Sequence, residues 1–189
     1  MFRTSEYFKK LTDVFDKLNI EQINNAINLI EATAADGRQI FTCGNGGSAY
    51  AASHYITDWN KMYSIETGKP FRGISLCDNI GSITAYGNDI SYDQIFSGQL
   101  RALGRSGDLL LVVSGSGNSK NVIEAINSAK QMSIGTLAFV GYDGGECAKL
   151  ADNVIHIPSF DMQFCEDIHL ILGHIIMKKI CGYKIKSQK

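Results

Sequence analysis

The chain has 189 residues, and its 18 Lys and Arg nearly balance 19 Asp and Glu, for a net charge of −1. This length is typical of one domain with a sizeable core, and the balanced charge gives no sign of a nucleic-acid partner. The polar N-terminus and the lack of an apolar run of ~18 residues exclude a signal peptide and a membrane partner. The five scattered cysteines, without CxxC spacing, are typical of reduced thiols. We therefore expect a single domain over residues 1–189, with a cytoplasmic location.

Two amphipathic helices are predicted at the start of the chain. Apolar residues recur three and four positions apart over residues 4–17, and again in a segment that Asn19 can cap and that ends near Gly37. A sheet of modest size does not need both helices to cover it. We therefore expect one of these leading helices, which occupy residues 1–36, to pack against another subunit.

Short apolar segments alternate with helical segments through the rest of the chain. The predicted strands are 39–43, 70–78, 108–114, 134–140 and 153–158. One predicted helix begins at Ser48. Others cover 79–86, 92–103 and 120–132, and a short helix after 145 and a long terminal one over 161–182 follow. The clearest strand, DLLLVVS, is a continuous apolar run of the kind that parallel sheets bury on both faces. This alternation predicts a doubly wound α/β fold, in which helices flank a five-stranded parallel sheet.

Two of the predicted strand-to-helix turns are rich in glycine and serine, Gly44–Ser48 and Ser114–Ser119. In open α/β sheets ligands bind beyond the carboxyl ends of the strands, where free N–H groups and hydroxyls can hold a phosphate. One such turn is compatible with an ordinary connection, but two in one sheet favour a phosphate monoester site. Neither turn has the Walker lysine. The partial GxGxxG match has Ala49 at its third position, so a nucleotide is the weaker interpretation.

Candidate acid/base or metal-binding side chains follow the first turn and recur in the terminal helix. His54 and Asp58 are four residues apart, so they project from one helix face, as metal ligands, a catalytic pair or an exposed structural pair. Their place one turn past a phosphate-type loop favours a functional role. His174 lies in the apolar run LILGHIIM and is either a core or a site residue. His169 lies more than about 100° around the same helix and is predicted to be structural, and His156 is predicted to be a strand residue on the other face of the sheet.

These motifs resemble the sugar isomerase (SIS) family, and within it the bacterial phosphoheptose isomerases. The resemblance rests on CGNGGSAYAASHYITD, on YGND at 86–89, on SGSGNS at 114–119, on GYDGGE at 141–146 and on EDIHLILGH. It implies an SIS fold and a homotetramer with active sites between subunits. It also implies interconversion of sedoheptulose 7-phosphate and D-glycero-D-manno-heptose 7-phosphate, the first step of nucleotide-activated heptose synthesis, at a zinc-supported site.

The resemblance assigns site roles to individual positions. Those implied to contact the phosphorylated sugar are Asn45, Gly46, Gly47, Ser48, Asn88, Asp89, Ser114, Gly115, Ser116 and Ser119. Those implied to hold one Zn²⁺ per subunit are His54, Asp58, Glu166 and His174.

Three of these positions depart from the family pattern: Asp58 replaces the usual Glu, Glu166 the usual Gln, and Gly115 the usual Thr. Displacing a catalytic base by ~1 Å can lower the rate about a hundredfold. The shorter side chain of Asp58 could therefore lower the activity. Glu166 and His174 are about 12 Å apart along an ideal helix axis. To share one ion, both side chains must lean inward or the start of the helix must be irregular.

Aldose–ketose isomerisation moves a proton between C1 and C2 through an enediol(ate), which needs a base and a group that shuttles the hydroxyl proton. We predict Asp58 as the base and His174 as the opposing acid/base, and the sequence leaves the reverse order open. Two alternative functions remain: a non-catalytic SIS module that binds a phosphosugar or a protein, and an isomerase of another sugar phosphate. His54 and His174 favour an enzyme, because a scaffold needs neither.

Overall fold

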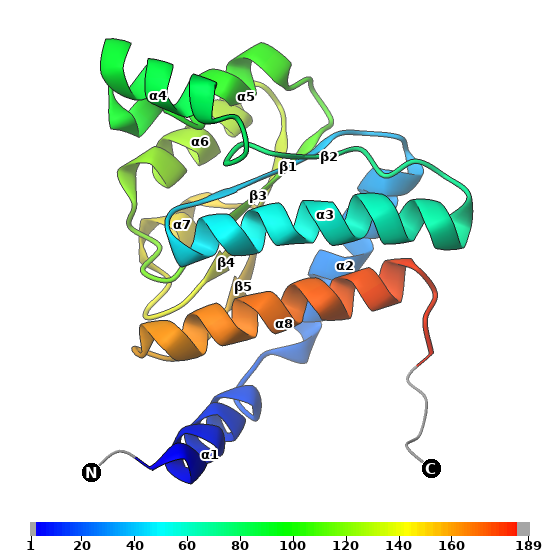
Figure 1. Ribbon diagram of the computed structural model, residues 1–189, viewed down its shortest axis with the longest axis vertical. Coiled ribbons are helices and arrows are strands. Elements are labelled where there is room, and N and C mark those ends of the chain that lie inside the picture. Colours follow the sequence, from blue (N-terminus) through cyan, green and yellow to red (C-terminus); the bar gives the residue numbers. More distant parts are fainter. Residues whose placement is uncertain (1–2, 185–189) are drawn as a thin grey trace.

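The computed structural model describes residues 3–184, whose five strands form one parallel sheet (Figure 1). The strands are β1 Ile40–Gly44, β2 Gly73–Ser75, β3 Leu109–Ser114, β4 Gly135–Val140 and β5 Asn153–His156, in the order β2-β1-β3-β4-β5. After β1 the chain forms β2 on one side of β1, and it then forms β3, β4 and β5 in succession on the other side. β1 and β3 are therefore the neighbours at which the topology switches, which is where open α/β sheets bind ligands.

Helices cover both faces of this sheet. The helices of the described residues are α1 Thr4–Phe15, which stands apart from the sheet, α2 Ile20–Ala35, α3 Gly47–Thr67, α4 Ile80–Asp89, the short 3₁₀ helix η1 Tyr92–Gln94, α5 Ser97–Leu103, α6 Lys120–Gln131, α7 Gly145–Leu150 and α8 Met162–Ile180. Alternate residues of β3 point to opposite faces, as the pleat requires. Leu109 and Leu111 join a core with α2, α3 and α8, whereas Leu110 and Val112 join one with α5, α6 and α7. The predicted doubly wound α/β fold is confirmed.

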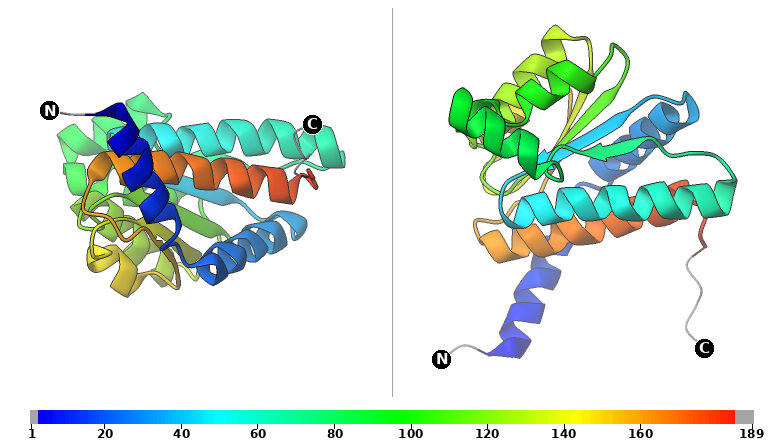
Figure 2. Two further views of the ribbon diagram at one scale, coloured as in Figure 1. Left: turned by 90° about the horizontal axis from the view of Figure 1, so that it is seen from below. Right: turned by 45° about the horizontal axis from the view of Figure 1, so that its top comes forward.

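Helices α3 and α8 lie side by side on one face of the sheet, as both views of Figure 2 show. α1 projects away from the sheet and reaches the rest of the chain near the start of α8 (Figure 1), where the hydroxyl of Tyr7 donates to Asp167 at 2.6 Å. On α1, Phe8 is 63% exposed. The packing of a leading helix against another subunit stays a prediction. Within residues 3–184, no helix has the length and hydropathy needed to cross a membrane.

Three predicted boundaries are wrong. The predicted loop at 87–89 is the last turn of α4, which ends where the N–H of Ile90 donates to Tyr86. The predicted helix 92–103 is divided into η1 and α5, and short 3₁₀ turns of this kind are common next to helix starts. The predicted strand 70–78 pairs only over three residues, because the chain turns away after Ser75.

Candidate active site

Three polar side chains meet between α3 and α8. The Nε2 atoms of His54 and His174 are 2.9 Å apart, and their rings are nearly perpendicular. Oδ2 of Asp58 lies 3.4 Å from Nε2 of His54 and 3.8 Å from Nε2 of His174. All three side chains are partly exposed to solvent, so they form the wall of an open site rather than a buried network. The chemistry available is that of two imidazoles and a carboxylate converging on one point.

This cluster opens into a cavity of about 610 Å³ between the two helices. The lining residues are Gly47, Tyr50, Ala51, His54, Glu166, Asp167, Leu170 and His174. Apolar and ionisable side chains alternate around it, so a polar ligand would bind here through a few specific groups.

A second, smaller cavity of about 250 Å³ lies where β1 and β3 end. Its lining residues are Asn45, Gly46, Gly47, Ser48, Val113, Ser114, Gly115, Ser116, Ser119, Met162 and Glu166. Most of the residues that the resemblance assigns to the sugar phosphate are therefore brought together. The two cavities adjoin, because Gly47 and Glu166 line both.

The backbone of the small cavity is arranged to receive an anion. Gly46 has φ 52°, a left-handed conformation that suits glycine, and it immediately precedes the first turn of α3. Within residues 3–184 the N–H groups of Gly47 and Ser48 in that turn have no hydrogen-bond partner, and the turn is the positive end of a 21-residue helix. The N-terminus of α6 follows the second loop at Ser119. A phosphate here would meet N–H donors from both loops without a lysine.

The serine hydroxyls of the second loop are oriented by its own backbone. Oγ of Ser114 accepts from the N–H of Gly117 at 3.1 Å, and Oγ of Ser116 accepts from the N–H of Asn118 at 3.3 Å. Because each oxygen serves as an acceptor in these bonds, each O–H proton is left to donate. Such hydroxyls suit a phosphate oxygen.

Sequence reasoning missed one residue that joins the two loops. Asn121, 2% exposed, exchanges two side-chain hydrogen bonds of 2.8 Å with Asn45. The hydroxyl of Tyr92 also donates to Asn45, at 3.2 Å. The predicted contact residue Asn45 is thus held in place from α6 and η1. The available sequence signal was an asparagine two residues past the second loop, at the start of the following helix.

Glu166 is not part of the cluster formed by His54, Asp58 and His174, whose ligand atoms all lie within 4.8 Å of one another. Instead its carboxylate lies against Gly47, where any side chain would collide with it. The structure therefore brings His54, Asp58 and His174 together but, contrary to the prediction, does not bring Glu166 to the same point. The reason is the helix rise of about 1.5 Å per residue, which separates Glu166 from His174 by two turns.

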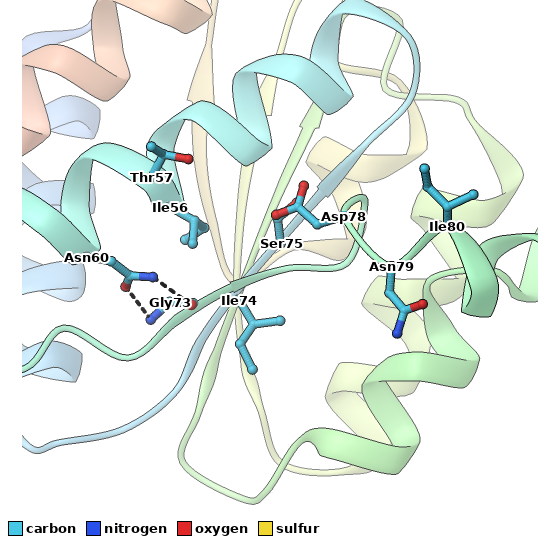
Figure 3. Close-up of a pocket in the computed structure, with 9 residues that line it drawn as sticks. All are labelled: Ile56, Thr57, Asn60, Gly73, Ile74, Ser75, Asp78, Asn79 and Ile80. Atoms are coloured by element: carbon cyan, nitrogen blue, oxygen red, sulfur yellow. Dashed lines mark hydrogen bonds between the residues drawn. The ribbon is translucent and has the colours of Figure 1, made fainter.

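Asn88 and Asp89 also lie apart from both cavities of their own chain. They end α4, are exposed to solvent, and are hydrogen-bonded to each other at 2.8 Å. A third cavity, of about 710 Å³, lies between α3, β2 and the turn into α4 (Figure 3). Among residues 3–184, Asp78 is the one ionisable group that lines it, and no predicted site residue does.

The two remaining histidines have structural positions. His169 is fully buried and stacks on Phe139, and burial lowers the pKa of its ring to about 3. Among residues 3–184, neither of its ring nitrogens has a hydrogen-bond partner. His156 bonds through Nε2 to the carbonyl oxygen of Tyr142 at 2.8 Å. The site therefore uses His54 and His174.

A doubly wound sheet with a glycine- and serine-lined cavity at its switch point is typical of α/β proteins that bind phosphorylated ligands, and the chain was compared with known proteins. The model of the SIS domain matches residues 6–141, so the chain belongs to the SIS domain family. A probable phosphoheptose isomerase of Thermoplasma acidophilum is 39% identical over 86% of this chain and 89% of its own length. The phosphoheptose isomerase of Helicobacter pylori is 36% identical over 82% of this chain and 81% of its own.

Solved structures give the same result. The phosphoheptose isomerase of Neisseria gonorrhoeae superimposes with a TM-score of 0.87 at 32% identity, covering 94% of this chain and 96% of that one. The enzyme of Francisella tularensis has a TM-score of 0.88 at 26% identity, over the same shares. The resemblance indicated by the motifs is confirmed, and with it the prediction that the chain is an isomerase.

Proposed function

We propose that this chain interconverts sedoheptulose 7-phosphate and D-glycero-D-manno-heptose 7-phosphate. The observation that carries the proposal is the pair of adjoining cavities that share Gly47 and Glu166. One is lined by N–H groups and hydroxyls that suit a phosphate. The other is lined by His54 and His174, with Asp58 beside both rings. A phosphorylated sugar lying across Gly47 would have its phosphate in the first cavity and its carbonyl end in the second.

The phosphate end is bound by the two loops. The hydroxyls of Ser48, Ser114, Ser116 and Ser119 donate to the phosphate oxygens, together with the N–H groups of Gly46, Gly47 and Gly115. Asn45 contacts the sugar, and Asn121 fixes the orientation of its amide. Because all of these groups are neutral donors, they hold the anion by hydrogen bonds and by the two helix N-termini.

The cluster fits a zinc ion. Two imidazole nitrogens and one carboxylate oxygen form a ligand set that Zn²⁺ takes in catalytic sites, with its fourth position open. We assign one Zn²⁺ per subunit to His54, Asp58 and His174. Bound there, it would act as a Lewis acid on the carbonyl oxygen of the sugar. Glu166, which stands apart from this set and borders both cavities, is assigned to the sugar hydroxyls.

Asp58 and His174 carry out the proton transfers. Asp58 takes a proton from C1 of the ketose, exchanges it with solvent and gives a proton to C2, so the reaction passes through an enediol(ate). In the metal-free site His174 protonates O2 and receives the proton that leaves O1, because an Nε2 atom that ligates an ion cannot carry a proton. Oδ2 of Asp58 faces both histidines, and its other carboxylate oxygen makes no hydrogen bond within residues 3–184, which leaves it for the carbon acid.

We further propose that the enzyme acts as a cytoplasmic homotetramer at the first step of nucleotide-activated heptose synthesis. Asn88 and Asp89 lie outside the cavities of their own chain, and the exposed stripe of α1 includes Phe8. Both observations support subunit contacts, with Asn88 and Asp89 reaching the sugar in the active site of a neighbouring subunit. Light scattering of the purified protein measures the subunit number.

The experiment that tests the function is incubation of the purified chain with sedoheptulose 7-phosphate, followed by NMR of the products. Other phosphorylated ketoses, assayed in parallel, separate a heptose enzyme from an isomerase of another sugar phosphate. Conversion of sedoheptulose 7-phosphate with the highest kcat/KM supports the proposal. Preference for a different ketose would reassign the substrate, and binding without conversion of any sugar would indicate a non-catalytic module.

A further inference from the structure

Two aromatic side chains of α3 donate hydrogen bonds to the main chain of α8. The hydroxyl of Tyr55 bonds to the carbonyl oxygen of His169 at 2.5 Å, and Nε1–H of Trp59 bonds to that of Gly173 at 3.0 Å. Both donors are buried, with exposed fractions of 1% and 0%. Their rings are stacked, with centroids 5.3 Å apart and planes 10° from parallel. The two donors are one helix turn apart, and so are the two acceptors.

These bonds are additional to the helical hydrogen bonds of α8. A carbonyl oxygen has two lone pairs, so each acceptor can serve its own helix and also receive a donor from α3. In a buried environment such a donor would be costly to leave unpaired. Tyr55 and Trp59 therefore each have one defined position along α8 at which their polar group is satisfied.

Gly173 lets the ring of Tyr55 on α3 approach the backbone of α8 closely. A side chain at this position would collide with the ring of Tyr55. Glycine is unfavourable in the interior of a helix, and Gly173 lies well inside α8. Its presence is explained by the ring that packs against it, one residue away from His174.

The hydrogen-bonded residues alternate with the residues of the cluster. On α3, His54 precedes Tyr55 and Asp58 precedes Trp59, while on α8, His174 follows Gly173. A slip of α8 by one residue would move His174 by about 1.5 Å along the axis and about 100° around it, and would break both bonds. The contacts that set the register of the two helices are thus next to the groups that must converge.

We propose that Tyr55 and Trp59 are positioning residues, which hold His54 and Asp58 opposite His174 by fixing the register between α3 and α8. The consequence for catalysis rests on the function proposed above, whereas the consequence for geometry does not. Neither residue touches the sugar in this account, since both side chains are buried and their polar groups bond to the main chain of α8.

The test compares Tyr55→Phe and Trp59→Phe with a matched control, Tyr63→Phe. Tyr55→Phe removes one hydroxyl and keeps the ring. Tyr63 lies on the same helix, is 6% exposed and packs on Phe71, and its hydroxyl has no hydrogen bond to any residue within 3–184. Four quantities are measured for each variant: the melting temperature, kcat and KM, the Kd for zinc, and the ring nitrogen signals of His54 and His174 in NMR spectra of the metal-free protein.

We expect Tyr55→Phe to lower kcat and zinc affinity by about tenfold or more, as loss of an outer-shell partner typically does, with little change in KM. The Nε2 signals of His54 and His174 shift, because their 2.9 Å contact loosens. Trp59→Phe acts in the same direction, and Tyr63→Phe leaves all of these values at the wild-type level.

The proposal is overturned if Tyr55→Phe lowers the melting temperature but leaves kcat, zinc affinity and the histidine signals at wild-type values. Such a result would make the bond purely structural. If the wild-type chain converts no sugar phosphate, the proposed function fails, and the histidine signals alone then decide whether Tyr55 positions the cluster. If Trp59→Phe does not fold, the result for Tyr55→Phe alone decides the test.

Discussion

The Nε2 atoms of His54 and His174 lie 2.9 Å apart, although the two residues are separated by 120 positions in the chain. At this distance two imidazoles either share one proton or ligate a common ion, because two protonated rings would repel each other. The carboxylate of Asp58 beside both rings suits either state. This contact makes the gap between α3 and α8 the chemical centre of the protein.

Replacing Asp58 by Asn removes the proposed base with little change in shape. We expect Asp58→Asn to lower kcat by ~10²–10⁴-fold, which is the usual contribution of general base catalysis. Affinity for inorganic phosphate, measured by ³¹P NMR titration, stays unchanged, since the phosphate cavity does not include residue 58. Asp36→Asn, the same change at the end of α2, serves as the control and leaves both values unaltered. An active Asp58→Asn enzyme would exclude this carboxylate as the base.

Zinc binding distinguishes the cluster from Glu166. His54→Ala and His174→Ala each remove a ligand, so their zinc Kd rises beyond the ~10–100-fold that loss of an outer-shell partner costs. In Glu166→Gln, which changes a residue outside the cluster, the rise in the zinc Kd stays below that range. Competition with a chromogenic chelator measures the three constants. A loss of affinity in Glu166→Gln as large as in His54→Ala would restore Glu166 as a ligand.

Local patterns predict the sheet and both loops, because each depends on residues close together in sequence. The apolar run of β3 and the glycine–serine turns Gly44–Ser48 and Ser114–Ser119 are of this kind. The spacing of His54 and Asp58 also predicts that they share a helix face. The family resemblance supplies the partnership with His174.

Other features depend on how helices pack, which spacing does not encode. The position of Glu166 against Gly47 is set by the rotation of α8 over the start of α3. The pairing of Asn45 with Asn121 joins residues 76 positions apart, from two separate loops. The extension of α4 through Asn88 and Asp89 overrides a composition that is typical of turns. The end of α4 is predicted wrongly, and the sequence analysis makes no prediction of the Asn45–Asn121 pair or of the contact between Glu166 and Gly47.

By the family resemblance, Gly115 replaces a usual Thr. Met162 packs against Gly115, so a side chain at this position would collide with the Met162 sulfur. The φ of Gly115 is not positive, so the backbone tolerates a substitution. We expect Gly115→Thr to push Met162 into the phosphate cavity and raise KM about tenfold, in line with the cost of overpacking. Adding Met162→Ala should recover most of that loss. Steady-state kinetics of both variants measures this, and an equally high KM in the double variant would contradict the explanation.

His169 makes stability depend on pH. Burial lowers the pKa of its ring to about 3, from the value near 6.5 expected in the unfolded chain. Between these values the unfolded state binds more protons, so the wild type loses stability as the pH falls. We expect the difference in unfolding free energy between His169→Leu and wild type to grow by roughly 2 kcal/mol, in favour of the variant, from pH 7.5 to pH 5. Urea titrations at the two pH values measure it, and a constant difference would contradict a neutral buried ring.

The account depends most on the transfer of a carbon-bound proton at the cluster of His54, Asp58 and His174. The direct measurement is NMR of sedoheptulose 7-phosphate incubated in D₂O with the wild type and with Asp58→Asn. The account predicts that the wild type forms the aldoheptose 7-phosphate with deuterium at C2, and that Asp58→Asn forms neither the product nor the deuterated ketose. Absence of both product and exchange with the wild type, or undiminished exchange with the variant, would contradict it.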